Sequence, residues 1–304
     1  MKKFVIVCLC ALTLLLSPAL IRAAAISPSI VELTSSPGET VESSFTILNT
    51  GVSEQTYFID LLAFEPSEED GTPVFTSGEI SENSFLSWMK FPIREVSVPE
   101  LSKVDVPFSI VVPDDIPAGS YYGAMTVSTA PTEIVAANGA IIEAKTAILV
   151  FLTVRGETTE KLELLDFMIE QTDSTLPFGI LRYRVQNQGN VHLIPEGEVK
   201  LTGLFGQEIA SLNANESKGR VLPSSTRTYE IPFGSKDVRW LDRAGYQLKH
   251  LLFGPVTAQL TLTYGQTGSL TSQTTIWVIP VELLAILGSG MLVVLLLFHK
   301  LKKQ

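Results

Sequence analysis

Two short acidic runs have side chains that could coordinate a divalent cation. Asp114 and Asp115 precede Ile116-Pro117-Ala118-Gly119, and Glu68-Glu69-Asp70 lies in a polar stretch. Calcium takes about six to eight oxygen ligands from a loop of defined spacing, and neither run has that spacing. We expect Asp114 and Asp115 to accept backbone N–H bonds in a turn. The second run is expected to be a solvated loop, so the sequence predicts no metal and no cofactor.

Nucleophilic or metal-assisted catalysis has no recognisable motif in this chain. The three histidines, His192, His250 and His299, have no neighbours at metal-ligand spacing. A Gly-x-Ser-x-Gly elbow, a phosphate-binding loop and a His-Glu-x-x-His motif are all missing from the sequence. We therefore expect a protein that is not an enzyme, although convergent acids brought together only by folding would escape a reading of this kind.

Aromatic residues give a second set of candidate binding positions. Trp88, Tyr121 and Tyr122, together with Asp114 and Asp115, are our candidates for a recognition surface. Each aromatic residue also has a structural interpretation. Trp88 could pack in a core rather than form a platform for carbohydrate. Tyr121 or Tyr122 could form a tyrosine corner, in which the hydroxyl bonds to the backbone upstream.

The elements that would position these residues are β-strands. Segments that alternate with period two are cut by Gly, Pro, Asn and Ser, which is typical of a β-sandwich. In the first half we expect strands at 30–33, 41–48, 56–64, 85–91, 104–112, 121–128 and 146–154. In the second half we expect strands at 162–169, 179–186, 197–202, 227–231, 256–264 and 271–278. Residues 66–82 and 129–140 are predicted to be loops.

A weak internal repeat suggests two copies of one fold. Phe45, Ile47 and Asn49 alternate before Thr50-Gly51, and Tyr183, Val185 and Asn187 alternate before Gln188-Gly189. The sequence predicts an all-β protein with two tandem immunoglobulin-like β-sandwich domains, at residues 26–155 and 156–275. Because the connection at 156–159 is short, we expect the domains to stack end to end with limited swing.

Both ends of the chain are apolar. Lys2 and Lys3 precede an apolar core from Phe4 to Leu16, and Ala23-Ala24-Ala25 resembles a cleavage site. We expect residues 1–25 to be a signal peptide, with an uncleaved anchor as the alternative. Residues 276–298 are predicted to be one transmembrane helix, followed by a basic cytoplasmic tail at 299–304. Glu282 is expected at the level of the outer headgroups, with a buried functional carboxylate as the alternative. The protein would be a single-pass cell-membrane protein with its domains outside.

The composition of the exterior part limits the partners. Both cysteines, Cys8 and Cys10, lie in the signal segment, so the mature protein would contain no disulfide. The whole chain has a net charge of −10; removing the six bases and one acid outside residues 26–275 leaves 16 basic and 31 acidic residues, a net charge near −15. No cluster of Lys and Arg occurs in that part, so nucleic-acid binding is disfavoured.

The order of these features resembles the WxL-interacting proteins of Gram-positive cell envelopes. The resemblance rests on Ser36 to Thr40, Leu48 to Gly51, Ser87 to Phe91 and Val112 to Ala124, and it extends to about residue 155. It implies a signal peptide, two immunoglobulin-like domains, one transmembrane helix and a basic tail. It also implies that the first domain contacts peptidoglycan.

Together these features predict a non-enzymatic, membrane-anchored surface protein that binds or scaffolds envelope components. The expected partner is a cell-wall polymer or a cell-surface protein, and the first domain, which would lie farther from the membrane, is expected to make the contact. The alternative is a membrane-tethered, chaperone-like assembly factor that donates an edge strand to exported clients.

Overall fold

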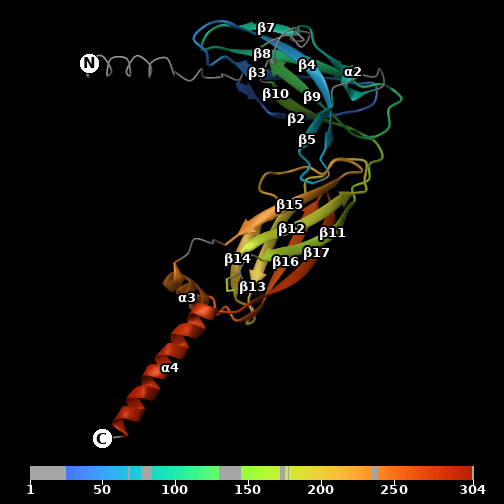
Figure 1. Cartoon of the computed structure of the whole chain (residues 1–304). Coiled ribbons are helices and arrows are strands. Elements are labelled where there is room, and N and C mark those ends of the chain that lie inside the picture. Colours follow the sequence, from blue (N-terminus) through green and yellow to red (C-terminus); the bar gives the residue numbers. More distant parts are fainter. Residues whose placement is uncertain are drawn as a thin grey trace, which may run out of the picture.

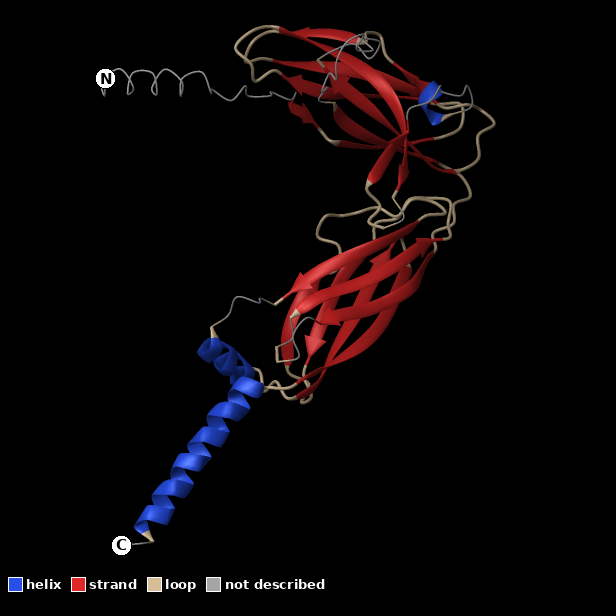
Figure 2. Ribbon diagram, viewed as in Figure 1, coloured by secondary structure: helices blue, strands red, loops and turns tan. Residues whose placement is uncertain are grey.

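A computed structural model describes residues 25–302 except 68, 77–83, 130–144, 172–174, 177 and 235–238. The expected signal segment and most of the expected loop at 129–140 lie outside the described residues. The described chain is mostly β-structure, arranged as two β-rich units followed by a long apolar helix (Figures 1 and 2). The coarse fold prediction, a mainly β protein with an apolar C-terminal helix, is confirmed.

The N-terminal unit consists of two sheets that share one core. One sheet has the order β1 (Ala25–Ser27), β3 (Thr40–Leu48), β8 (Lys103–Val111), β6 (Met89–Lys90). The other has the order β2 (Ile30–Ser35), β10 (Thr146–Val154), β9 (Gly119–Ser128), β4 (Gln55–Pro66), β5 (Pro73–Thr76), and β7 (Glu95–Val98) also pairs with β4. The first strands bridge both sheets, since β1 pairs with β3 and β2 runs parallel to β10.

Period-two alternation builds this core. Phe45 and Ile47 of β3 and Ile148 and Val150 of β10 are each at most 1% exposed and belong to one cluster. Burial of a large apolar side chain contributes roughly 1.5–3 kcal/mol, so these strand faces supply the main stabilisation of a unit that has no disulfide.

The C-terminal unit repeats this plan. Its three-stranded sheet has the order β11 (Leu162–Gln171), β12 (Gly179–Asn187), β15 (Thr226–Phe233). Its four-stranded sheet has the order β14 (Glu208–Asn213), β13 (Glu196–Thr202), β16 (Gly254–Tyr264), β17 (Gly268–Val278). The predicted phase of β16 is confirmed, since Leu260 is fully buried at 0% exposure and Thr261 is exposed.

The internal repeat has a physical counterpart in two buried asparagines. Asn49, at the end of β3, accepts a bond from the N–H of Gly51 and donates to the carbonyl of Ser53. Asn187, at the end of β12, accepts from the N–H of Gly189 and donates to the carbonyl of Val191. Each side chain therefore fixes the loop that follows its strand, by the same pair of contacts.

Several segments differ from the sequence-based expectation. The strand expected at 85–91 is a short helix, α2 (Phe85–Trp88), followed by β6. Three of the four helix side chains are buried, whereas a strand with one exposed face would bury only every second side chain. The predicted loop at 66–82 begins as the β4–β5 hairpin. Strands β1, β5, β7 and β14 and the helix α3 (Trp240–Lys249) were not predicted.

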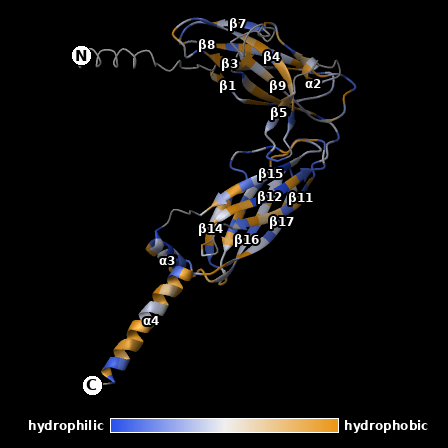
Figure 3. Cartoon of the chain, viewed as in Figure 1, coloured by the Kyte–Doolittle hydropathy of each residue, from blue (hydrophilic) through white to orange (hydrophobic). Residues whose placement is uncertain are grey.

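The apolar C-terminal helix, α4, spans Val281–Leu301, and among the described residues it is the one helix with the length and composition to cross a membrane (Figure 3). It begins later than the predicted residue 276, because Ile276 to Val278 continue the alternation of β17. Glu282, in its first turn, is only 5% exposed and forms an ion pair with Arg243 of α3.

Candidate functional site

Two of the predicted binding residues belong to the core of the N-terminal unit. Trp88 is 6% exposed, and its ring lies 4.8 Å from that of Tyr121, so it cannot serve as a surface platform and that prediction is corrected. The hydroxyl of Tyr121 donates to the carbonyl of Pro117 at 2.8 Å. This is the bond to the upstream backbone expected of a tyrosine corner, so Tyr121 has a structural role here.

The other three predicted residues do not form one cluster: Asp114 and Asp115 share a turn, and Tyr122 follows Tyr121 in β9. Asp114 and Asp115 are exposed in a turn, and a β-carbon at Gly38 would lie 2.2 Å from Oδ1 of Asp114. No group of three or more His, Cys, Asp or Glu that could hold a metal occurs among the described residues. Tyr122 is on the outer face of the six-stranded sheet, and it borders a cavity between the two units.

The junction between the units has an apolar centre. Phe64, Ala124 and Phe151, from the outer face of the sheet that contains β9 and β10, pack with Leu222 from the C-terminal unit. All four side chains are at most 5% exposed. The C-terminal unit therefore covers part of a sheet face as well as meeting the loops at the end of the first unit.

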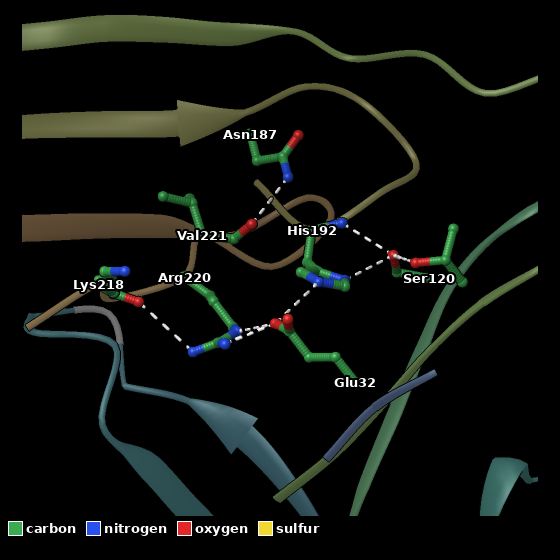
Figure 4. A network of polar contacts seen from close by, with 8 residues as sticks. Glu32, Ser120, Asn187, His192, Lys218, Arg220 and Val221 are labelled. Atoms are coloured by element: carbon green, nitrogen blue, oxygen red, sulfur yellow. Dashed lines mark hydrogen bonds and ion pairs between the residues drawn. The ribbon is translucent and has the colours of Figure 1, made fainter. Parts of the chain in front are cut away.

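A polar network lies beside this apolar centre, and Figure 4 shows its side chains. Ser120 Oγ lies 2.8 Å from Nδ1 of His192 and accepts the backbone N–H of His192 at 3.0 Å. Arg220 contacts the carboxylate of Glu32 through Nε at 2.6 Å and Nη2 at 2.5 Å. The guanidinium of Arg220 also lies 5.2 Å from the ring centroid of Phe151, a cation–π distance. Side chains of both units therefore hold the junction.

His192 is largely covered within this network, with 13% of its side chain exposed. Burial lowers the pKa of the imidazole. The nearby Glu32 carboxylate opposes this decrease, and the positive charge of Arg220 adds to it. The ring is therefore neutral near pH 7, and protonating it would place a charge beside Arg220 in a poorly solvated position.

Close backbone approach also joins the units. The N–H of Ser120 donates to the carbonyl of Asn190 at 2.8 Å, and the amide of Asn190 donates to the carbonyl of Ala118 at 2.9 Å. Gly119 makes this approach possible, since it has φ +150° and a β-carbon there would lie 2.8 Å from the carbonyl oxygen of Asn190.

Beside the junction the two units enclose an open cleft. Its floor is the outer face of β12 and β15, and one wall is the β4–β5 hairpin of the N-terminal unit. Two adjoining cavities of about 830 Å³ and about 480 Å³ make up the cleft, and Arg184 of β12 lines both. Tyr122 lies in the smaller one. A ligand in this cleft would contact both units at once.

The arginines at the cleft differ in how they are paired. Arg182 forms ion pairs with Glu170 and Glu230, and Arg227 donates to the carbonyl of Arg220 at 3.0 Å. Arg184 is exposed, and its guanidinium makes no hydrogen bond or ion pair with any described residue. Arg184 is therefore the cation in the cleft with donors available to a ligand.

A strand edge also faces the cleft. The N–H of Thr228, on the outer edge of β15, donates to the carbonyl of Glu69 in the hairpin at 3.0 Å. Because outward N–H groups alternate along an antiparallel edge, that of Glu230 points the same way. The hairpin tip is itself ordered by Asp70, whose pKa falls to about 2 because Thr72 and Ser67 donate to its carboxylate.

The sequence reasoning missed most of this site. The one available signal was the alternation of Arg182 and Arg184 on the solvent face of a predicted strand. Nothing in the spacing shows that this face lies opposite a hairpin more than 100 residues earlier in the chain. In the same way, His192 could only be assigned to a turn, although it contacts Ser120, 72 residues before it.

No family model and no curated protein matches this chain. Among solved structures, it is similar to CfaA, a class 5 fimbriae chaperone, with TM-score 0.42 and 10% identity over 83% of this chain and 99% of that one. It is similar to the chaperone YadV with TM-score 0.41 and 9% identity over 84% and 100%. It is similar to the E. coli chaperone DraB with TM-score 0.38 and 11% identity over 84% and 97%. Similarity at this level assigns neither a client nor an activity to this chain.

Proposed function

We propose that this chain is a non-enzymatic, membrane-anchored protein that binds a segment of another exported protein in the cleft between two immunoglobulin-like domains. The observation that carries the proposal is Arg184, an exposed guanidinium that lines both cavities and has no described partner. The domains are those expected at residues 26–155 and 156–275, outside the cell. The helix α4 anchors them, and the basic tail lies in the cytoplasm.

The chemistry of the cleft suits an extended peptide with a carboxylate. A guanidinium presents a planar fork of N–H donors that matches a carboxylate, and such charge-assisted bonds are the strong ones. The outer edge of β15 already bonds one backbone carbonyl, that of Glu69, and an added strand uses the same kind of contact. The strand edge would recognise protein backbone and the guanidinium would recognise an acidic group, so we favour a protein partner over a glycan.

The proposal adopts the assembly-factor alternative in a modified form. In that alternative this chain would donate an edge strand to the client, whereas here the client adds a segment to an edge of this chain. The edge available to a client is that of β15. In this arrangement the client lies between the units, and the contacts of the junction around His192 keep the cleft open.

Peptidoglycan binding by the first domain, as the WxL resemblance implies, remains the competing function. The hairpin, which we expected to be a solvated loop, contacts the C-terminal unit through Glu69 and Gly71. The fold therefore leaves less of that segment available to a wall polymer than the sequence suggested.

A binding comparison separates the two functions. The full chain in lipid nanodiscs would be titrated with peptides from exported proteins, with free and amidated C-termini, and sedimented with purified cell wall. Arg184→Glu should weaken peptide binding tenfold or more, because a hydrogen bond to a charged group is worth about 1.5–3 kcal/mol. Lys103→Glu, an equal charge change at an exposed position of β8, should leave it unchanged. The proposal would be refuted if the chain bound no peptide and if the wild type and Arg184→Glu sedimented equally with cell wall.

A further inference from the structure

Large apolar side chains are exposed at the end of the C-terminal unit that adjoins α4. We call six of them the apolar collar; each is more than half exposed, at 54–69%. They are Phe205, Leu241, Leu248, Leu251, Phe253 and Trp277. A contiguous exposed patch of this kind on a folded unit marks an interaction surface rather than ordinary surface scatter.

The collar residues come from four separate segments that meet at one place. Phe205 is in the β13–β14 loop, where Gln207 donates to the carbonyl of His250 at the end of α3 at 2.7 Å. A β-carbon at Gly254 would lie 3.8 Å from side-chain atoms of both Leu204 and Trp277. The loop, α3, the segment after α3 and the end of β17 are therefore packed around a common point.

Helix α3 is held at the first turn of α4. The fully buried amide of Gln247 donates to Glu282 at 2.6 Å and to the carbonyl of Thr175 at 2.9 Å, and its oxygen accepts the N–H of Leu283 at 3.0 Å. Arg243 of α3 pairs with the same Glu282 at 3.2 Å. These contacts fix α3 beside the start of α4, so α3 lies at the same level along the α4 axis as the first turn of α4 (Figure 1).

The length of α4 gives that depth. A helix of 21 residues rises about 31 Å, which matches a hydrocarbon core of about 30 Å. If α4 spans the membrane from Val281 to Leu301, the hydrocarbon begins at Val281. The collar then lies at the level of the outer lipid headgroups, where aromatic and amphipathic side chains are favoured.

On α3, the exposed Leu241 and Leu248 are seven residues apart and so share one face, while Asp242 and Lys249 lie on another. The buried face, with Ala244 and Gln247, is turned to the protein. An exposed apolar face beside a charged one is the arrangement of a helix that lies in the membrane interface.

We propose that the apolar collar is a lipid-binding surface that inserts into the headgroup–acyl boundary of the outer leaflet and fixes the tilt of the C-terminal unit on the membrane. The inference rests on the proposed anchoring by α4. The collar adds to that anchor a second contact, which sets how the cleft is presented above the membrane.

Tryptophan quenching in nanodiscs tests this surface in the full chain. In Trp240→Phe, Trp277 is the one tryptophan near the membrane, and the buried Trp88 in the N-terminal unit is a constant background. Lipids brominated near the headgroup should quench Trp277 at least twofold more than lipids brominated near the chain end. Protease protection of the C-terminal lysines is measured in sealed liposomes of the same lipids, where an inserted α4 places the tail in the lumen, so failure of α4 to insert is distinguished from failure of the collar to bind.

A double substitution distinguishes lipid contact made by the collar from proximity to the membrane that α4 alone would cause. Leu248→Ser with Phe253→Ser, in the Trp240→Phe background, should reduce shallow quenching of Trp277 by at least half. Val52→Ser, at a 72% exposed residue of the N-terminal unit, is the matched control and should not change it. Unquenched Trp277 with α4 inserted would overturn the proposal, as would quenching that the double substitution leaves unchanged.

Discussion

At the scale of single residues, the imidazole of His192 makes the junction sensitive to acid. Burial lowers its pKa in the folded protein, whereas an exposed histidine has a pKa of about 6.5. As pH falls below about 6.5, the unfolded chain takes up a proton that the folded chain does not, so the contribution of this site to stability is lost on the acid side. Glu32 and Arg220 are the charged groups that face the ring.

We therefore predict that the melting temperature falls more steeply between pH 7 and pH 5.5 in the wild-type chain than in His192→Gln. Glutamine retains a polar side chain but does not titrate. Differential scanning calorimetry at several pH values measures this difference. Superimposable pH profiles for the two proteins would show that the imidazole does not govern the effect.

The phase of β16 predicts a second contrast between neighbouring residues. Leu260→Ala should lower the free energy of unfolding by about 2–5 kcal/mol, because it leaves a cavity in the core shared by both sheets. Thr261→Ala, on the exposed face, should cost under about 0.5 kcal/mol. Urea titration of each variant measures the difference. Equal losses would mean that the strand is rotated relative to the structure described above.

At the scale of elements, the start of β9 sets the distance between the units. Gly119→Ala would place a methyl group against the carbonyl of Asn190, so the turn must shift and the junction loosen. We expect a loss of about 1–3 kcal/mol, typical of a strained backbone position. Gly206→Ala is the control, since Gly206 also has a positive φ, +77°, but has no neighbour within 4 Å. Faster proteolysis at 155–160 in the first variant, but not the second, is the expected result.

The elements show where reading the sequence succeeds and where it stops. Strands such as β3, β10 and β16 were predictable because one face of each is buried, which imposes period two. Helix α3 was not, because its buried side includes Gln247 and Arg243, which bond to Glu282 and Thr175 instead of forming an apolar stripe. The apolar face of α3, with Leu241 and Leu248, is exposed instead, so the helix has no apolar stripe toward a core, and α2 is too short to show one.

At the scale of the whole molecule, the fold class and the two apolar ends followed from the sequence, whereas the cleft did not. Residues 69–72 and 182–184 meet only because the junction bends one unit over the other. No local pattern encodes the junction contacts, such as Glu32 with Arg220, which are 188 residues apart. Of the candidate residues chosen from the sequence, Trp88 and Tyr121 pack in the N-terminal unit and Tyr122 lines the cleft, whereas Arg184 was found from the fold.

The proposed topology makes a prediction about intact cells. Protease added outside should digest the β-rich units and leave a fragment that begins near residue 276 and carries α4. The reason is that the apolar helix precedes His299, Lys300, Lys302 and Lys303, which favours a cytoplasmic tail. Immunoblotting with a C-terminal tag detects the fragment, and an internal cytoplasmic protein controls for lysis. Complete protection of the units would place them inside the cell.

Photo-crosslinking in living cells tests the central claim most directly. A photoreactive residue at Gln186 lies in the cleft, and one at Thr261 lies on the exposed face of the other sheet. We predict that position 186 forms an adduct with an exported protein, that Arg184→Glu abolishes it, and that position 261 forms none. Equal adducts at both positions, or an adduct at 186 that survives Arg184→Glu, would contradict the account.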